Sequence, residues 1–469
     1  MKILLVTPHI SMQARYGNFA GAGNSTPTLG LLMLAAVAQR HGHSCVVVDA
    51  AAAVQPLAAI LHAAQVQAPD LIGISSTTLS IMNAAEAARA LKAVAPGSPL
   101  VLGGPHVSAV PEETMARFPE FDIGVLGEGE ETFVELLAVL ARSATPETVR
   151  GLIFRQDGRL VRTGQRPPIR TLDALPPPAW ELLEGFPQSY LPAPFKTRLR
   201  PAASIVTTRG CPNRCIFCDR SVFGSSCHGY SAKGVIDLVE DLQRRFGIRE
   251  ICFEDDTFTM DRDRLDAVCH DLCRLKRPVA WSCLGRVNHV EPEMLANMRR
   301  AGCWYISFGI ESGNQAILDR INKRTTLVQI RQAVIAARAA GITVKGFFMV
   351  GHPGETRATL VDTVRFALDL PLDDISVTMF TPFPGSAIHA QAAEFGTYDP
   401  DWSRMNLLNA VFVPHGLTVD DLVAAQREML RRFYRRPRIM ANYLWRLARN
   451  PALCRGFWQG LRALRAQTV

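Results

Sequence analysis

The sequence predicts an α/β protein in which a doubly wound parallel domain precedes an incomplete barrel of the TIM type and a helical C-terminal segment. Two observations lead to this prediction. Short apolar runs alternate with helical patterns across the first 140 residues, and six further β/α units follow a proline-rich stretch. A chain of 469 residues is also too long for one ordinary core. We therefore expect divisions at residues 1–144, 145–200, 201–397 and 398–469.

The first domain opens with a strand over Lys2–Thr7 and a helix over Leu29–Arg40. Further strands are expected at Ser44–Asp49, Asp70–Ser75, Leu100–Leu102 and Asp122–Leu126, with a helix at Met82–Val94. Parallel sheets of this kind bind ligands beyond the carboxyl ends of their strands. Small or glycine-rich residues in three of the loops at those ends let a bulky ligand approach the backbone. The four loops are Thr7-Pro8-His9, Ser75-Ser76-Thr77, Gly103-Gly104-Pro105-His106 and Gly127-Glu128-Gly129-Glu130.

The stretch from 145 to 200 is rich in proline and has a turn at Asp157-Gly158, so we expect a linker or cover with its own small hairpin. The strands of the second series are expected at Ala203–Thr208, Glu250–Phe253, Val279–Cys283, Tyr305–Gly309, Val344–Val350 and Ile375–Phe380. Its helices are expected at Ala232–Phe246, Arg262–Leu275, Glu293–Ala301, Leu327–Ala340 and Glu355–Leu370. The active site of such a barrel lies at the carboxyl ends of its strands.

Three cysteines, Cys211, Cys215 and Cys218, come directly after the first strand of the second series. The chain has eleven cysteines and no visible export signal, so thiols or metal ligands are expected rather than disulfides. Three thiolates on one loop can hold three irons of a 4Fe-4S cluster and leave the fourth iron open for a substrate-like ligand. The spacing also leaves open a zinc site, with His228 as its only nearby fourth ligand, and a set of buried structural thiols.

The Cys-x3-Cys-x2-Cys spacing, with Phe217 before the last cysteine, resembles the signature of the radical S-adenosylmethionine superfamily. The segment FEDDTFTMD (253–261) resembles the loop that meets the methionyl amine, which implies a contact from Asp255 or Asp256. In FGIESG (308–313), Glu311 is similar in position to an acid that binds the ribose or the carboxylate. Structural alternatives are a helix N-terminal pair for the two aspartates and a salt bridge for Glu311.

The N-terminal domain resembles the Rossmann-like cobalamin-binding domain that precedes many members of this superfamily. The resemblance implies that three loops surround the cobalamin: Ser75, Ser76 and Thr77; Gly103, Gly104 and Pro105; and Gly127, Glu128 and Gly129. The Asp-x-His-x-x-Gly loop of many cobalamin proteins is replaced here by Pro8-His9-Ile10-Ser11-Met12. We therefore expect cobalamin without a protein histidine on cobalt. A His9 ligand and a fold that has lost its corrinoid are the alternatives.

The resemblance implies an enzyme like the class B radical S-adenosylmethionine methyltransferases. In such an enzyme the reduced cluster cleaves S-adenosylmethionine to a 5'-deoxyadenosyl radical, which takes a hydrogen from an unactivated carbon, and methylcobalamin supplies a methyl group to that carbon. An external electron donor such as flavodoxin or ferredoxin is implied. Ring closure or rearrangement with the same cofactors is one alternative, and a non-catalytic cobalamin carrier or regulator is another.

The net charge of +8 is concentrated in residues 427–465, which hold eleven arginines and one glutamate together with aromatic residues. No basic groove for nucleic acid is therefore expected. Tryptophans among arginines favour contact with anionic lipid, and a solvated helical face is the alternative. Because no export signal or long apolar span is visible, we expect a cytoplasmic protein with peripheral membrane contact through this segment and a small or lipid-like substrate.

Overall fold

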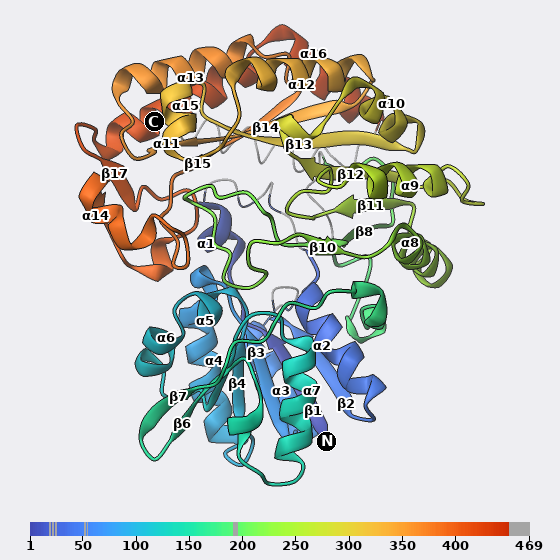
Figure 1. The fold of residues 1–469 in the computed structure, drawn as a ribbon, viewed down its shortest axis with the longest axis vertical. Helices are drawn as coiled ribbons and strands as arrows, with labels where there is room; N and C mark the ends of the chain where they lie inside the picture. Colours follow the sequence, from blue (N-terminus) through green and yellow to red (C-terminus); the bar gives the residue numbers. More distant parts are fainter. Residues whose placement is uncertain are drawn as a thin grey trace.

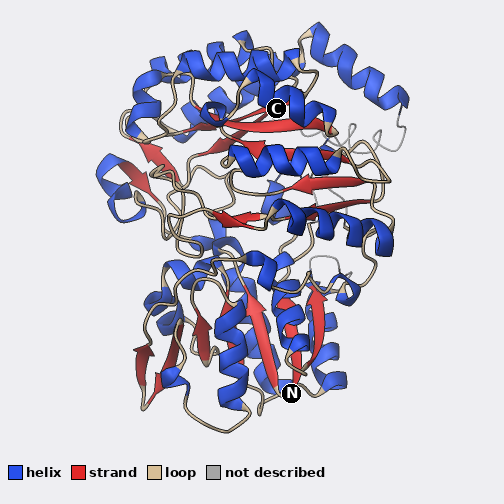
Figure 2. Cartoon of the chain, turned by 45° about the vertical axis from the view of Figure 1, so that its right-hand side comes forward, coloured by secondary structure: helices blue, strands red, loops and turns tan. Residues whose placement is uncertain are grey.

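The computed structural model describes residues 1–449 apart from 18–19, 21–22, 24–25, 51–52, 54 and 191–195. An N-terminal α/β domain lies below a second α/β domain in Figure 1. The central strands of the lower sheet point toward the upper domain, so the carboxyl edge of this sheet faces the barrel (Figure 2). The predicted fold class is confirmed.

The N-terminal domain is built on a seven-stranded sheet with the order β2-β1-β3-β4-β5-β6-β7. Its parallel strands are β1 (Lys2–Thr7), β2 (Ser44–Asp49), β3 (Leu71–Ser75), β4 (Leu100–Gly103) and β5 (Ile123–Val125). Its helices are α1 (Met12–Tyr16), α2 (Leu29–Arg40), α3 (Pro56–Gln67), α4 (Ile81–Val94), α5 (Pro105–Ala109), α6 (Pro111–Arg117) and α7 (Glu130–Leu140). Strand β1 is apolar from Ile3 to Val6 because helices cover both faces of the sheet.

An antiparallel hairpin, β6 (Leu152–Gln156) and β7 (Arg159–Arg162), extends this sheet beyond β5. The expected boundary at residue 144 therefore cuts through the sheet, since the hairpin placed in the linker belongs to the first domain. Strand β5 has three residues, and the fully buried Ile153 of β6 packs into the same apolar cluster as β1 and β3. An antiparallel neighbour covers an edge that such a short strand would leave open.

Residues 179–186 of the proline-rich stretch pack between the two domains. The Ala179 N–H donates to the Leu32 carbonyl of α2 at 3.2 Å. The ring of Phe186 stacks on Trp180 at 4.8 Å and meets the edge of Phe246 in the barrel at 5.0 Å. This segment thus joins the cores of the two domains.

The second domain is a six-stranded parallel sheet with the order β15-β14-β13-β12-β11-β8, in which each strand neighbours the next along the chain. The strands are β8 (Ala202–Ile205), β11 (Glu250–Phe253), β12 (Ala280–Gly285), β13 (Cys303–Glu311), β14 (Thr343–Val350) and β15 (Asp374–Met379). The helices are α8 (Ala232–Phe246), α9 (Arg262–Leu272), α10 (Pro292–Arg300), α11 (Gln315–Arg320), α12 (Leu327–Ala339) and α13 (Arg357–Asp369). This arrangement is the predicted incomplete barrel.

The C-terminal segment begins differently from the helical expectation. Helix α14 (Ala392–Phe395) leads into a small antiparallel pair, β16 (Gly396–Tyr398) and β17 (Phe412–Pro414), and helices α15 (Val419–Tyr434) and α16 (Pro437–Arg449) follow. Between β16 and β17, Trp402 is buried against the N-terminal domain, with its ring 4.4 Å from His106. Trp402 begins a short 3-10 turn (Trp402–Arg404) in place of the expected α-helix.

Much of the basic segment that we expected at the membrane, residues 450–465, lies outside the described residues. None of the helices in the described part of the chain combines the length and the apolar character that a bilayer crossing requires.

Candidate active site

The loop that carries the three cysteines is closed by a two-residue ladder. Strand β9 (Thr208–Arg209) pairs antiparallel with β10 (His228–Gly229). Between β9 and Cys211, Gly210 has a φ of +80°, and a Cβ there would lie 2.1 Å from the Ser226 carbonyl oxygen. A glycine is required at this position by both the backbone conformation and the close approach. The ladder and Gly210 hold the cysteine loop directly beyond β8.

The three cysteines meet different neighbours. The Asn213 amide donates to the sulfur of Cys211 at 3.2 Å, and the Thr257 hydroxyl lies 3.7 Å from the same sulfur. Cys215 is buried, and Cys218 is exposed. A hydrogen bond from Cys218 lowers the pKa of Cys215, with the cations of Lys323 and Arg286 acting in the same direction and burial opposing them.

Within the described residues, no group of three or more His, Cys, Asp or Glu side chains converges on one point as ligands of a single metal ion. A structural zinc centre would need four such ligands around one point. The ligands of an iron–sulfur cluster bind separate irons, so their sulfurs need not converge. The donor set fits a cluster better than a zinc ion.

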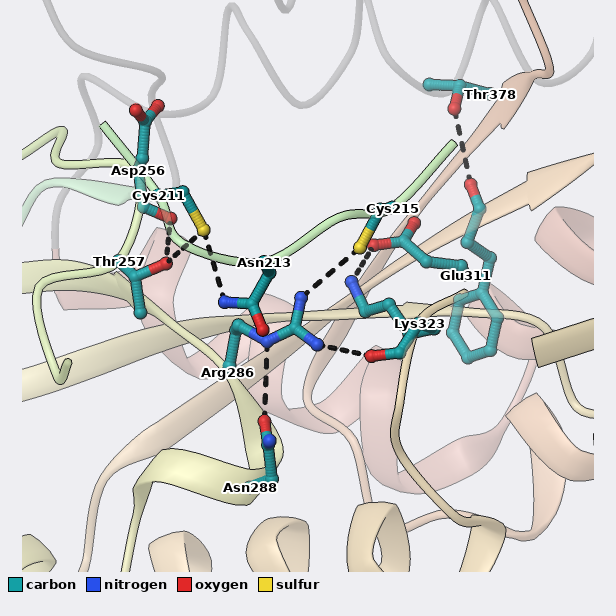
Figure 3. A network of polar contacts seen from close by, with 11 residues as sticks. Cys211, Asn213, Cys215, Asp256, Thr257, Arg286, Asn288, Glu311, Lys323 and Thr378 are labelled. Carbon is teal, nitrogen blue, oxygen red and sulfur yellow. Dashed lines mark hydrogen bonds and ion pairs between the residues drawn. The ribbon is translucent and has the colours of Figure 1, made fainter. Parts of the chain in front are cut away.

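Glu311 lies at the end of β13 with a φ of +68°, and its carboxylate is buried (Figure 3). Lys323 donates to its Oε1 at 2.6 Å and lies 5.8 Å from the centre of the Phe217 ring. The predicted cofactor acid is thus engaged in an ion pair, which was the structural alternative. Phe217 itself is half-buried and lies 6.5 Å from the ring of Phe380.

Asp255 and Asp256, which the sequence could not separate, have opposite environments. Asp255 is fully buried, and its Oδ1 accepts hydrogen bonds from the backbone and hydroxyl groups of Thr207 and Thr208, while burial raises its pKa. Asp255 thereby ties the loop after β11 to the chain after β8. Asp256 is exposed, and its side chain points away from Thr257, above Cys211 (Figure 3). Of the two, only Asp256 is exposed to solvent, whereas Asp255 keeps a buried Oδ2 without a partner among the described residues.

At the facing edge of the N-terminal sheet, the loops after β3 and β4 approach closely. Gly104 has a φ of +98°, and a Cβ there would lie 2.6 Å from the Ser76 carbonyl oxygen and 2.9 Å from the Ser75 hydroxyl. A Cβ at Gly103 would meet nothing within 4 Å. Thr77 caps the short 3-10 turn at Thr78–Ser80, and Pro105 starts α5. The edge therefore offers open backbone at Gly103 beside a tightly packed Gly104.

Several buried polar atoms at this edge have no hydrogen-bond partner among the described residues: Ser76 Oγ, Thr7 Oγ1, His9 Nδ1 and His106 Nε2. Such atoms cost free energy unless a ligand or water satisfies them. His106, which we did not predict as a site residue, is fully buried, and burial lowers its pKa to about 4, so it is neutral. The sequence could have indicated His106 as a site residue, because it follows Pro105 in the loop at the carboxyl end of β4.

The loop from Gly127 to Glu130 joins the two edges. Glu128 Oε1 lies 2.7 Å from His228 Nε2 and 3.5 Å from Arg209 Nη1, and Glu130 pairs with Arg209 Nη2. All four side chains are nearly inaccessible to solvent. A Cβ at Gly127 would lie 3.6 Å from the Val222 carbonyl oxygen. These ion pairs attach the carboxyl edge of the N-terminal sheet to the ladder beside Cys211.

Gly129 ends the same loop, and a Cβ at this glycine would lie 3.2 Å from the Leu34 side chain of α2. Glu128 Oε2 also accepts the Ile169 N–H at 2.6 Å. The carboxylate of Glu128 is therefore held by three protein groups, so its observed contacts are structural.

Comparison with known proteins agrees with both halves of the site. The radical SAM superfamily model matches residues 205–367, and the B12 binding domain model matches residues 17–137. An uncharacterized methyltransferase, PH0819, of Pyrococcus horikoshii is 32% identical over 442 residues, which are 94% of each chain. The chain belongs to the radical SAM superfamily and carries a B12-binding domain.

Two further proteins resemble the chain over most of its length. An anaerobic magnesium-protoporphyrin IX monomethyl ester cyclase of Cereibacter sphaeroides is 30% identical over 385 residues, which are 81% of this chain and 62% of the cyclase. The structure of the cobalamin-dependent S-adenosylmethionine radical enzyme OxsB superimposes with a TM-score of 0.74 at 16% identity, covering 91% of this chain and 65% of OxsB. The latter similarity supports the two-domain fold.

Membership of this group implies a 4Fe-4S cluster, S-adenosylmethionine and cobalamin as cofactors. The residues present fit these groups. The barrel edge supplies thiols, one of which has a lowered pKa. The N-terminal edge supplies open backbone at Gly103 and an unsatisfied hydroxyl at Ser76. The chain is therefore a cobalamin-dependent radical SAM enzyme.

Proposed function

We propose that the chain is a methyltransferase that adds a methyl group to an unactivated carbon of a small or lipid-like substrate. Cys211, Cys215 and Cys218 would hold the 4Fe-4S cluster, and the loops at Ser76 and Gly103 would hold the cobalamin. When bound, the cluster and S-adenosylmethionine supply a radical that takes hydrogen from carbon, and cobalamin supplies the methyl group.

One observation carries this proposal. Arg209, two residues before Cys211, is buried and paired with Glu128 and Glu130 at the carboxyl edge of the N-terminal sheet. A buried pair of this kind is rigid because each charge would be costly without its partner. Two cofactors held on either side of these ion pairs would both reach one substrate that binds between them.

The protein residues would orient the cofactors and exclude water. Asp256, exposed beside Cys211, is the acid that we assign to the methionyl amine, while Asp255 fixes the loop beneath it. The segment around Trp180 and Phe186 packs against both domains, and we propose that it keeps solvent from the substrate pocket. No side chain needs to act as a general base.

The proposal is tested by anaerobic reconstitution of the full chain, followed by mass spectrometry of cell extract incubated with S-adenosylmethionine labelled in its methyl group. Methylation predicts a product that carries the label and consumption of about two S-adenosylmethionine per product, one as radical source and one as methyl donor. An Asp256→Asn variant should bind S-adenosylmethionine less tightly without losing iron. A reconstituted protein that does not cleave S-adenosylmethionine would overturn the proposal and support a non-catalytic carrier.

A second candidate is ring closure or rearrangement with the same cofactors, because the cyclase of Cereibacter sphaeroides matches 81% of this chain. The labelling experiment separates the two. Ring closure predicts one S-adenosylmethionine cleaved for each hydrogen removed and no label in the product. We place methylation first because the relative that matches 94% of the chain is named a methyltransferase.

We further propose a cytoplasmic enzyme that receives electrons from a flavodoxin or ferredoxin and contacts anionic lipid through its C-terminal helices. Arg427, Arg431 and Arg435 are exposed at four-residue spacing, so they share one face of α15. Exposed Met440 and Leu444 of α16 provide apolar contacts. Buried Met429 and Phe433 anchor α15, so point variants are a better test than a truncation.

The variant R427Q/R431Q/R435Q should lose binding to anionic liposomes. A matched variant outside the C-terminal segment, R142Q/R159Q/R170Q, removes the same exposed charge and should keep the binding. Equal liposome binding by the two variants, or no binding by the wild type, would refute the proposed membrane contact.

A further inference from the structure

Arg286 follows the last residue of β12, at the carboxyl end of the third barrel strand. Arg286 is only 7% exposed to solvent. Arginine has a positive charge at every physiological pH, so the fold holds a permanent cation at the edge of the cysteine loop. The sequence analysis did not single out this residue.

The guanidinium is fixed by three contacts from three segments (Figure 3). Its Nη1 donates to the sulfur of Cys215 at 3.5 Å, its Nε donates to Asn288 Oδ1 at 3.3 Å, and its Nη2 donates to the carbonyl oxygen of Lys323. The Lys323 carbonyl and the Asn288 amide oxygen are neutral acceptors that fix the orientation of the guanidinium group. The third contact, from Nη1, is directed at the sulfur of Cys215.

No carboxylate in the described part of the chain lies within 4.0 Å of the nitrogens of Arg286. The neighbouring acid, Glu311, is paired with Lys323 at 2.6 Å, so this second cation is already balanced. A buried charge is costly unless an opposite charge accompanies it. The guanidinium instead contacts the sulfur of Cys215 at 3.5 Å, and a cysteine that ligates iron does so as a thiolate.

We propose that Arg286 is a positioning residue that balances the charge of the Cys215 thiolate and thereby raises the reduction potential of the cluster. The inference rests on the proposed cluster site. Hydrogen bonds to ligand sulfurs and the local charge are two of the factors that set the potential of an iron–sulfur cluster. Reduction adds one negative charge, and a fixed cation beside a ligand favours the reduced state.

The test is a redox titration of the full reconstituted chain, without S-adenosylmethionine, followed by electron paramagnetic resonance of the reduced cluster. Arg286→Met removes the charge and the donor, Arg286→Gln retains a donor, and Arg286→Lys retains the charge. We expect the most negative potential for the Met variant, an intermediate one for Gln, and the value closest to wild type for Lys. Iron content, measured on the same samples, reports whether each variant still holds the cluster.

Arg338→Met is the matched control. Arg338 is a half-buried arginine of α12 that pairs with Asp373 at 2.9 Å and also donates to the Pro371 carbonyl, beside the amino ends of β14 and β15 and far from the cysteines along the barrel. We expect the control to keep the wild-type potential. A control that shifts as much as Arg286→Met would overturn the inference, because the effect would then be a general loss of structure.

Equal potentials in wild type and all three Arg286 variants would also overturn it. If the Met variant loses iron, the comparison of Gln with Lys decides, since a purely structural arginine would give these two variants the same potential as wild type. Loss of iron from all three variants would assign Arg286 to assembly of the site and reject the electrostatic role. A wild-type chain that binds no 4Fe-4S cluster would instead reject the proposed function.

Discussion

The carboxyl edges of the two sheets, which face each other, satisfy their polar groups in different ways. On the barrel side, Lys323 and Glu311 pair with one another, and Arg286 contacts Cys215. On the N-terminal side, Ser76 and His106 present buried atoms without partners. The barrel edge thus pairs Lys323 with Glu311 and directs Arg286 to Cys215, although Asp255 Oδ2 and Ser282 Oγ there also lack a partner in the described part of the chain. The unpartnered atoms of the N-terminal edge belong to uncharged side chains. The difference teaches that stability and ligand binding can be separated by variants at the two edges.

The largest effect is expected on the barrel side, from Lys323→Met. The side chains of Lys323 and Glu311 are 6% and 10% exposed, so the variant would leave a buried carboxylate without its partner. Urea unfolding of the apoprotein should show a loss of about 3–5 kcal/mol. Lys196→Met breaks a more exposed pair with Glu254 and should lower the free energy of unfolding by about 1 kcal/mol or less. Equal losses in the two variants would contradict the preorganised barrel edge.

The next effect is expected on the N-terminal side, from Gly104→Ala. Its φ of +98° and the Ser76 carbonyl oxygen 2.6 Å from the new Cβ should cost about 3 kcal/mol and displace the two loops. We expect cobalamin affinity, measured by absorbance titration, to fall about a hundredfold. Gly97→Ala, before the amino end of β4, is the matched control for added bulk, since its Cβ also meets nothing within 4 Å of the described residues. If G104A binds cobalamin as wild type does, the close approach is not needed.

Glu355 is one of several barrel residues with an unpartnered buried atom, and it gives a pH dependence. Its Oε2 accepts the N–H groups of Gly351 and His352, its Oε1 has no partner, and burial raises its pKa to about 7. The folded state thus holds a proton that the unfolded state releases near pH 4.5. The free energy of unfolding should fall by about 3 kcal/mol as the pH rises from 4.5 to 7. Glu355→Gln should remove this contribution.

The measurement is the difference between wild type and E355Q across that pH range. Burial lowers the pKa of His352 to about 4, so this histidine acts with the opposite sign, and subtraction of the two curves cancels it. A constant difference between the curves would show that Glu355 is ionised in the folded state.

The smallest effect is expected from two serine variants in the N-terminal sheet, one that changes cobalamin affinity and one that changes stability. Ser76→Ala removes a hydroxyl that has no protein partner, so the apoprotein should keep its stability while cobalamin affinity falls about fivefold, for about 1 kcal/mol. Ser98→Ala, before β4, removes a hydroxyl that donates to the Pro69 carbonyl at 2.6 Å. That variant should lose about 1–3 kcal/mol of stability and keep its affinity. The reverse pattern would refute the contrast between the edges.

The sequence predicted the elements well where the pattern is local. Strands β1 and β2 and helices α2 and α8 have the expected bounds, since apolar periodicity and end signals lie within each segment. The sequence predicted the hairpin itself, but not that β6-β7 joins the first sheet or that Trp402 returns to the N-terminal domain, because both depend on distant partners. Tertiary packing, which a single sequence does not display, decides such elements.

The candidate site divides in the same way. The cysteine spacing and the glycine-rich loops are local signals, and the structure places both at facing edges. Adjacent aspartates look alike in sequence, and only burial separates Asp255 from Asp256. Arg286 and Lys323 gain their importance from contacts with residues 71 and 12 positions away, respectively. Examining the residue after every barrel strand, as was done for the first domain, would have found Arg286.

The central claim is that Cys211, Cys215 and Cys218 hold an iron–sulfur cluster beside the cobalamin domain. Its most direct test is metal and sulfide analysis of the anaerobically reconstituted full chain, compared with single alanine variants of the three cysteines and with Cys273→Ala, an exposed cysteine of the barrel, as control. We predict about four irons per chain in wild type and in the control, and loss of that iron in each of the three variants. Zinc in place of iron, or unchanged iron in any of the three variants, would contradict the claim.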